Sequence, residues 1–224
     1  MYHCLFEQSG TFKNEFKKLG YEAQDYDIRN DFNETDNVVD LYNQILVEYD
    51  NLHNERERTI FDGIKQDELV IAFFPCIRFE NQTLLQFRGD NSGMKKWTDL
   101  EKLEYDIEHH KELSLNYELI TKLCIIAIIR KFKLIIENPY STQHYLQRYW
   151  CLKPKVIDED RTLTGDYFKK PTQYWFINCE QKNNFIFEGV DIKKKKTINN
   201  TKNQVERSMI SKDYANRFIR EYIL

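Results

Sequence analysis

The sequence predicts an α/β fold in which a mostly parallel sheet carries helices on both faces. Apolar runs of strand length alternate along the chain with stretches that have helical spacing, which is typical of βαβ units. The chain has 224 residues, of which 41% are hydrophobic, enough for the core of one medium-sized domain. It has only 7 glycines and 4 prolines, so each one carries positional information.

The first half of the chain alternates strand and helix patterns. "MYHCLFE" and "YEAQDYDI" are predicted strands, and the segment between them places apolar side chains at helical spacing before a stop at Gly20. Residues 36–50 are predicted to be helical, with apolar side chains on or near one face. "ELVIAFF" is a continuous apolar run and so predicts a strand buried on both sides.

The second half continues the alternation. Residues 97–131 are predicted to be mostly helical, as one helix or two, and "FKLIIEN" is predicted to be the next strand. "QYWFIN" and "FIFEG" are candidate strands near the end of the chain. "SKDYANRFIREYI" predicts a closing amphipathic helix.

Composition argues against several classes of protein. No signal peptide is visible, and charged residues break the most apolar run, "LCIIAIIRKFKLII", so we expect no membrane span. Five cysteines without a CxxC pair indicate reduced thiols, and we expect a cytoplasmic protein. We expect no metal site, because the only close histidines, His109 and His110, lie in a charged helical stretch.

Charge is distributed unevenly along the chain. Residues 1–180 have a net charge of −8, whereas residues 181–224 have a net charge of +5. The basic part contains Lys193, Lys194, Lys195 and Lys196 in one run. Such a run can follow the phosphates of a nucleic acid, or it can be a solvated loop, and composition leaves both open.

The ends of the predicted strands carry the candidate functional residues. Ligands of parallel α/β sheets bind beyond the carboxyl ends of the strands. The first strand leads into a turn with Ser9 and Gly10, and Asp27 ends the second, where an acid can bind ribose hydroxyls. The buried strand ends at Pro75-Cys76, and a later strand ends at Glu137.

Six segments occur in an order that resembles one protein family: "LFEQSG", "YDI", "FFPC", "IENP", "GDYFKKPTQYWFIN" and "ERSMISKDYAN". The order is similar to that of the cytosine-5 DNA methyltransferases, above all their short bacteriophage-type members. The resemblance covers about residues 4–220 and is weakest in 83–120 and 180–205. It implies a Rossmann-like S-adenosylmethionine-dependent methyltransferase fold: a single domain over 1–224, with a short basic insertion at about 180–205 in place of a large target-recognition region.

The resemblance implies a catalytic role for the residues at two strand ends. Cys76 would attack carbon 6 of a cytosine flipped out of DNA, and Pro75 would stiffen the turn that presents it. Glu137, held protonated, would act on the N3 edge of the base, while Asn138 would fix the loop geometry. A nearby cation must favour the thiolate, and Arg78 is the candidate.

The resemblance also implies binding residues. S-adenosylmethionine would contact Phe6, Ser9, Gly10, Thr11 and Pro75, with Asp27 on its ribose. DNA would be held by lysines of the late basic segments, namely Lys169, Lys170, Lys193, Lys194, Lys195 and Lys196.

Two positions depart from the family pattern. Gln8 stands where the family has a glycine, so its side chain would narrow the approach to the cofactor. Pro171 stands where the family has an arginine near the base, and Lys169, Lys170 or Arg161 are the candidate substitutes.

These departures leave two functions open. One is an active, phage-encoded DNA cytosine-5 methyltransferase that protects DNA from restriction, with or without a partner protein that supplies specificity. The resemblance implies that such a protein works in the cytoplasm of a bacterial host cell. The other is an inactive methyltransferase-like protein that binds nucleic acid, a nucleotide or a host protein, for example as an anti-defence factor. RNA remains an alternative to DNA. A nicotinamide-dependent enzyme would need a fuller glycine fingerprint than this chain has.

Overall fold

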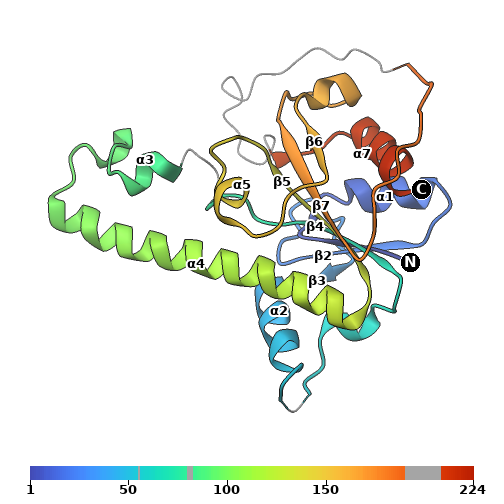
Figure 1. The fold of residues 1–224 in the computed structure, drawn as a ribbon, viewed down its shortest axis with the longest axis horizontal. Coiled ribbons are helices and arrows are strands. Elements are labelled where there is room, and N and C mark those ends of the chain that lie inside the picture. The colour runs from blue at the N-terminus through green and yellow to red at the C-terminus, as the bar shows by residue number, and fades with distance from the viewer. Residues whose placement is uncertain (55, 80–82, 190–207) are drawn as a thin grey trace.

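A seven-stranded sheet with helices on both faces forms the centre of the molecule (Figure 1). The computed structural model describes residues 1–54, 56–79, 83–189 and 208–224. The strand order is β3-β2-β1-β4-β5-β7-β6, where the strands are β1 (Tyr2–Leu5), β2 (Ala23–Asp27), β3 (Asn37–Val38), β4 (Leu69–Phe73), β5 (Lys133–Pro139), β6 (Val156–Asp158) and β7 (Thr172–Ile177). The predicted α/β class with a mostly parallel sheet is confirmed.

The strands β1 to β6 all run in the same direction, and β7 runs in the opposite direction between β5 and β6. β1 pairs with β2 and β4, and β4 pairs with β5, all in parallel register. β7 runs antiparallel to β5, and β6 runs antiparallel to β7. A plain dinucleotide-binding sheet has the order 3-2-1-4-5-6, so this sheet keeps the order 3-2-1-4-5 and differs by inserting β7 beside β5.

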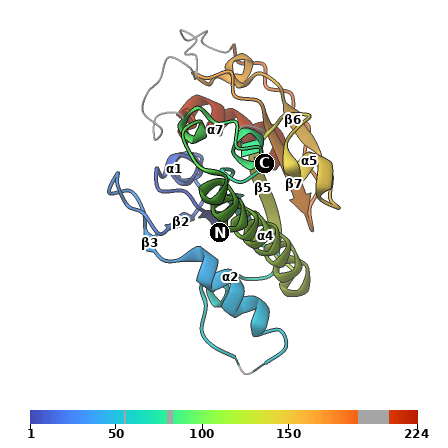
Figure 2. The same ribbon diagram turned by 90° about the vertical axis from the view of Figure 1, so that its left-hand side faces the viewer.

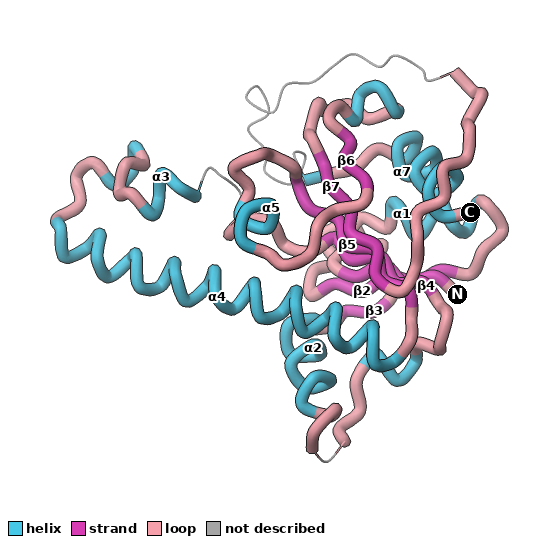
Figure 3. The backbone as a smooth tube through the Cα atoms, viewed as in Figure 1, coloured by secondary structure: helices cyan, strands magenta, loops and turns pink. Residues whose placement is uncertain are grey.

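Helices α1 (Thr11–Lys18) and α7 (Lys212–Phe218) cover one face of the sheet, and α2 (Leu41–Asp50) and the second half of α4 (Asp99–Arg130) cover the other (Figures 1 and 3). Each face has its own apolar cluster. Phe12, Phe16 and Phe218 lie in the first, and Ile45, Leu119 and Leu123 lie in the second. The fold therefore buries both faces, which explains why β4 is a continuous apolar run.

Helix α4 is one helix of 32 residues that extends beyond the sheet, with the short α3 (Thr83–Phe87) near its start (Figures 1 and 2). Thr98 begins it with a capping box, in which Thr98 and Glu101 each accept a hydrogen bond from the other's backbone N–H. Lys131, at φ 62°, ends it in the left-handed conformation. Of the two predicted alternatives, the single helix is correct.

Short elements complete the fold, namely η1 (Ile60–Gly63), η2 (Ser92–Met94), α5 (Tyr145–Tyr149), η3 (Arg161–Thr164) and η5 (Ile219–Ile223). Two of the secondary-structure predictions are wrong. Residues 37–38 form β3 beside β2 and not the start of a helix, because Asp40 accepts the N–H groups of Tyr42 and Asn43 and so begins α2 at Leu41.

The segment 185–189 was expected to be a strand and is not one. This segment does not pair with the sheet, and the side chains of Phe185 and Phe187 are 88% and 95% exposed. β6, which sequence patterning missed because it has only three residues, takes the edge position beside β7.

Candidate active site

The carboxyl ends of β1, β2, β4 and β5 meet at one cavity of about 210 Å³. Segments far apart in the chain therefore line a single space, as the position of ligand sites in parallel sheets requires. The lining residues that the sequence had singled out are Phe6, Gln8, Ser9, Asp27, Pro75, Cys76, Glu137, Arg161 and Lys170. Ser208, Met209 and Ile210, which precede α7, line it too.

Cys76 lies in the loop that follows β4. Pro75 precedes it, and the N–H of Phe79 donates to the carbonyl of Cys76 at 2.8 Å, which closes a tight turn. The Cys76 thiol is only partly buried, unlike those of Cys4 and Cys124 in the core. The loop therefore presents a cysteine to the cavity, whereas the core cysteines are packed as small apolar side chains.

Glu137 and Asn138 end β5 directly beside this loop. Glu137 is 8% exposed and pairs in register with Phe73 of β4 on one side and Tyr174 of β7 on the other. The amide of Asn138 donates to the carbonyl of Phe74 at 2.7 Å. This bond ties the end of β5 to the residue before Pro75, so Asn138 fixes the position of the cysteine loop.

Arg161 is a cation that lines the cavity, although its side chain is only 1% exposed. Its Nε donates to Asp166 at 2.7 Å, and its Nη2 donates to the same carboxylate oxygen. Its guanidinium carbon lies 5.0 Å from the ring centre of Tyr214. Burial acts to lower the pKa of Arg161, but the charge of Asp166 raises it above its ordinary value, and Glu137 adds to that rise.

Arg161 was one of three candidates for the arginine that the sequence lacks at Pro171. Lys170 also lines the cavity, but Lys169 is 64% exposed and pairs with Asp160 at 3.7 Å. Arg161 therefore stands out, because its rigid guanidinium is held in place by a buried carboxylate.

Arg78 does not line the cavity. Its guanidinium forms an ion pair with Glu112 of α4. Burial lowers the pKa of His109, and the charge of Arg78 adds to this effect. Burial raises the pKa of Tyr42, and the charge of Arg78 opposes that rise. The expectation of a cation two residues after the cysteine assumed that the chain continues along the cavity. The loop turns back toward α4 instead, so Arg78 anchors the loop to that helix.

The turn between β1 and α1 contains a residue that sequence reasoning missed. Glu7 is buried, and its carboxylate accepts the N–H of Phe12 at 2.6 Å and that of Lys13 at 3.3 Å. Burial raises the pKa of Glu7 to about 7, although these two hydrogen bonds act to lower it. The sequence could have indicated Glu7, because an acidic residue just before the start of a helix is stabilised by the helix dipole.

The backbone of the rest of this turn has the conformation that lets a ligand approach it closely. Phe6 and Gly10 both have positive φ, 60° and 61°. A Cβ on Gly10 would lie 3.1–3.2 Å from side-chain atoms of three neighbours, so only glycine fits without displacement. Ser9 and Thr11 bond to each other at 3.0 Å between their hydroxyl oxygens, but Gly10 and Thr11 do not line the cavity.

Two polar side chains complete the cavity wall. Asp27 accepts the N–H of Arg29 at 2.8 Å, and burial raises the pKa of its carboxyl. Gln8 has a buried side-chain oxygen with no hydrogen-bond partner among the described residues. An unsatisfied buried acceptor on a cavity wall is costly unless a ligand or water supplies a donor.

Comparison with known proteins adds no identification. No protein-family model matches the chain, and no curated protein matches it either. Among the described residues, no helix is long and apolar enough to cross a membrane, and no three His, Cys, Asp or Glu side chains gather as metal ligands. Lys193, Lys194, Lys195 and Lys196 lie outside the described residues.

Proposed function

We propose that this protein is a DNA cytosine-5 methyltransferase that uses S-adenosylmethionine. The observation that carries the proposal is the convergence of Cys76, Glu137 and Arg161, from three separate segments, on the cavity that Asp27 also lines. A thiol, a carboxyl and a guanidinium at one cavity match the needs of nucleophilic attack on a polarised ring.

The residues present fit the cofactor at its ribose end. Asp27 offers a carboxylate to ribose hydroxyls, and the Gln8 oxygen offers an acceptor to a donor group. Glu7 already accepts the N–H groups that begin α1, so an anionic end of the cofactor would be held elsewhere. When bound, the cofactor supplies an electrophilic methyl group.

The chain's own groups would divide the work on the cytosine. The Cys76 thiolate adds to carbon 6, which makes carbon 5 electron-rich. The Glu137 carboxyl would donate a proton or hydrogen bond at N3, and the planar Arg161 guanidinium would hold the exocyclic oxygen O2 or the thiolate. Once carbon 5 carries the methyl group, its proton would pass to water and the bond between carbon 6 and the Cys76 sulfur would break. A proton taken up at N3 would then return to the Glu137 carboxylate.

The test measures the transfer of labelled methyl groups from S-adenosylmethionine to duplex DNA. Label on cytosine that disappears in Cys76→Ser, while Cys151→Ser keeps full activity, would support both the reaction and the nucleophile. Cys151 is the matched control because it is free and exposed. No label with any duplex or RNA, in a chain that melts cooperatively, would contradict the proposal.

The second candidate is a methyltransferase-like protein without transferase activity. Two observations favour it: Gln8 fills the turn where the family has a glycine, and the cavity of about 210 Å³ is smaller than the usual ligand pocket of roughly 300–1,000 Å³. Thermal melting separates the two. A ligand that binds the folded state raises the melting temperature in proportion to its occupancy, so no shift with saturating S-adenosylmethionine would favour this candidate.

A further inference from the structure

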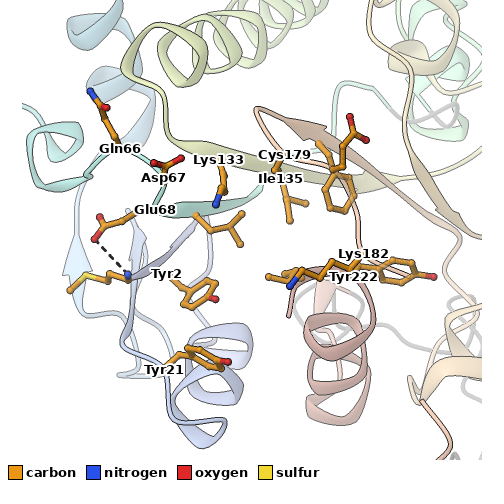
Figure 4. Close-up of a pocket in the computed structure, with 15 residues that line it drawn as sticks. Tyr2, Tyr21, Gln66, Asp67, Glu68, Lys133, Ile135, Cys179, Lys182 and Tyr222 are labelled. Atoms are coloured by element: carbon orange, nitrogen blue, oxygen red, sulfur yellow. Dashed lines mark ion pairs between the residues drawn. The ribbon is translucent and has the colours of Figure 1, made fainter. Parts of the chain in front are cut away.

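A second and larger cavity, of about 600 Å³, lies at the opposite, amino edge of the sheet (Figure 4). Its lining comes from the starts of β1, β4 and β5, the segment after β7 and the end of the chain. Its volume falls within the range of sites for small organic ligands. No step of the proposed methyl transfer uses it.

The walls of this cavity are apolar and aromatic. Leu69 and Ile135, from neighbouring strands, line it together with Phe176 of β7. Tyr2 and Tyr21 meet edge to face with ring centres 5.4 Å apart, and Tyr222 lies on the other side of the cavity in Figure 4. Rings on two sides suit a flat ligand, because aromatic faces and edges both pack well against a ring.

A partly buried lysine, Lys133, lines the cavity. It extends into the space between Glu68 and Cys179 in Figure 4, and among the described residues its ammonium has no ion-pair or hydrogen-bond partner. The side chain is only partly exposed, and its charge acts to lower the pKa of the Cys179 thiol, which burial raises to about 11. A partly desolvated ammonium gains from a bound anion.

The acids that line the cavity are either paired within the protein or exposed to solvent. Glu68 pairs with the amine of Met1 at 3.5 Å and with His3 at 3.1 Å. Glu180 is 77% exposed and pairs with Lys155 at 3.6 Å. Asp67 is exposed. Lys182 donates to the carbonyl of Leu224, which leaves Lys133 as the cation that faces a ligand.

We infer that this cavity binds a small anionic molecule with a flat ring, its carboxylate or phosphate on Lys133 and its ring between the tyrosines. The site is separate from the cavity around Cys76 and does not depend on the methyl-transfer proposal.

The probe for this inference is phenyl phosphate, with benzoate as the carboxylate arm. Titration of the full chain, followed by amide chemical shifts, should show saturable changes at Tyr2, Ile135 and Cys179. Lys133→Gln should weaken binding at least tenfold. Lys65→Gln, an exposed lysine at the same edge that does not line the cavity, should leave binding unchanged. Tighter binding of one probe tells which anion the site prefers.

A second measurement needs no variant. Alkylation of Cys179 by iodoacetamide, followed by mass spectrometry at each cysteine, should slow when phenyl phosphate is present, while Cys151 reacts at an unchanged rate. Three results would overturn the inference: no saturable binding of either probe, equal binding by Lys133→Gln, or shift changes confined to the cavity around Cys76.

Discussion

The two edges of the sheet differ in how their polar side chains are held. At the carboxyl edge, Glu7, Asn138 and Arg161 each have fixed hydrogen-bond partners in the protein. At the amino edge, the Lys133 ammonium has none among the described residues. The polar groups at the carboxyl edge are therefore preorganised, whereas the amino edge offers an unpaired ammonium beside apolar walls, which suits the binding of an anion.

The largest expected effect lies at Cys76. Cys76→Ala should reduce methyl transfer by at least about a thousandfold, because the covalent step is lost, with little change in stability. Cys124→Ser should do the reverse: it places a hydroxyl in the core, which costs about 1–3 kcal/mol of unfolding free energy. Burial raises the pKa of the Cys124 thiol to about 12, so this thiol is not a nucleophile. Methyl-transfer rates and denaturant melts together measure this contrast.

The second effect lies at Asp166, which positions Arg161. Asp166→Asn leaves a buried guanidinium without its counter-charge, which costs about 3–5 kcal/mol when one partner of a buried pair is removed. Lys169→Gln breaks only the exposed pair with Asp160 and should cost less than about 1 kcal/mol. Equal melting curves for the two variants would show that Arg161 does not depend on Asp166.

The third effect is a dependence of stability on pH that comes from Glu7. The folded pKa of about 7 lies above the ordinary value of 4.5, so the protonated form is favoured by folding. This contribution is fully present below pH 4.5 and is lost as pH rises through 7. It amounts to about 3 kcal/mol. Glu7→Gln should remove it, so the stability difference between variant and parent should change between pH 5 and pH 8. A constant difference would contradict the assignment.

The smallest effect tests whether the two edges are independent. Lys133→Gln should leave methyl transfer within about twofold of the parent rate, because sites without shared partners act nearly additively. The measurement is the same labelled-methyl assay at saturating DNA. A loss of more than tenfold with the fold intact would show that the two cavities are coupled through β5, whose ends lie at opposite edges.

Much of the fold follows from local pattern. The strand-length apolar runs at 68–74 and 132–138 correspond to β4 and β5, because a strand buried on both faces needs apolar side chains at every position. β6 and β3 could not be predicted in this way. They have three and two residues, and only their pairing with β7 and β2 makes them strands.

The candidate site likewise has some features that local sequence predicts and others that it does not. The residue pattern alone predicts which chemical groups stand at the strand ends: a thiol at 76, a carboxyl at 137 and an acid at 27. Which cation joins them depends on long-range packing. Arg161 enters the cavity because Asp166 and Tyr214 hold it there, and Arg78 leaves it because Glu112 pairs with it on α4. Strand ends follow from local periodicity, but a side chain's partners depend on segments far away in the chain.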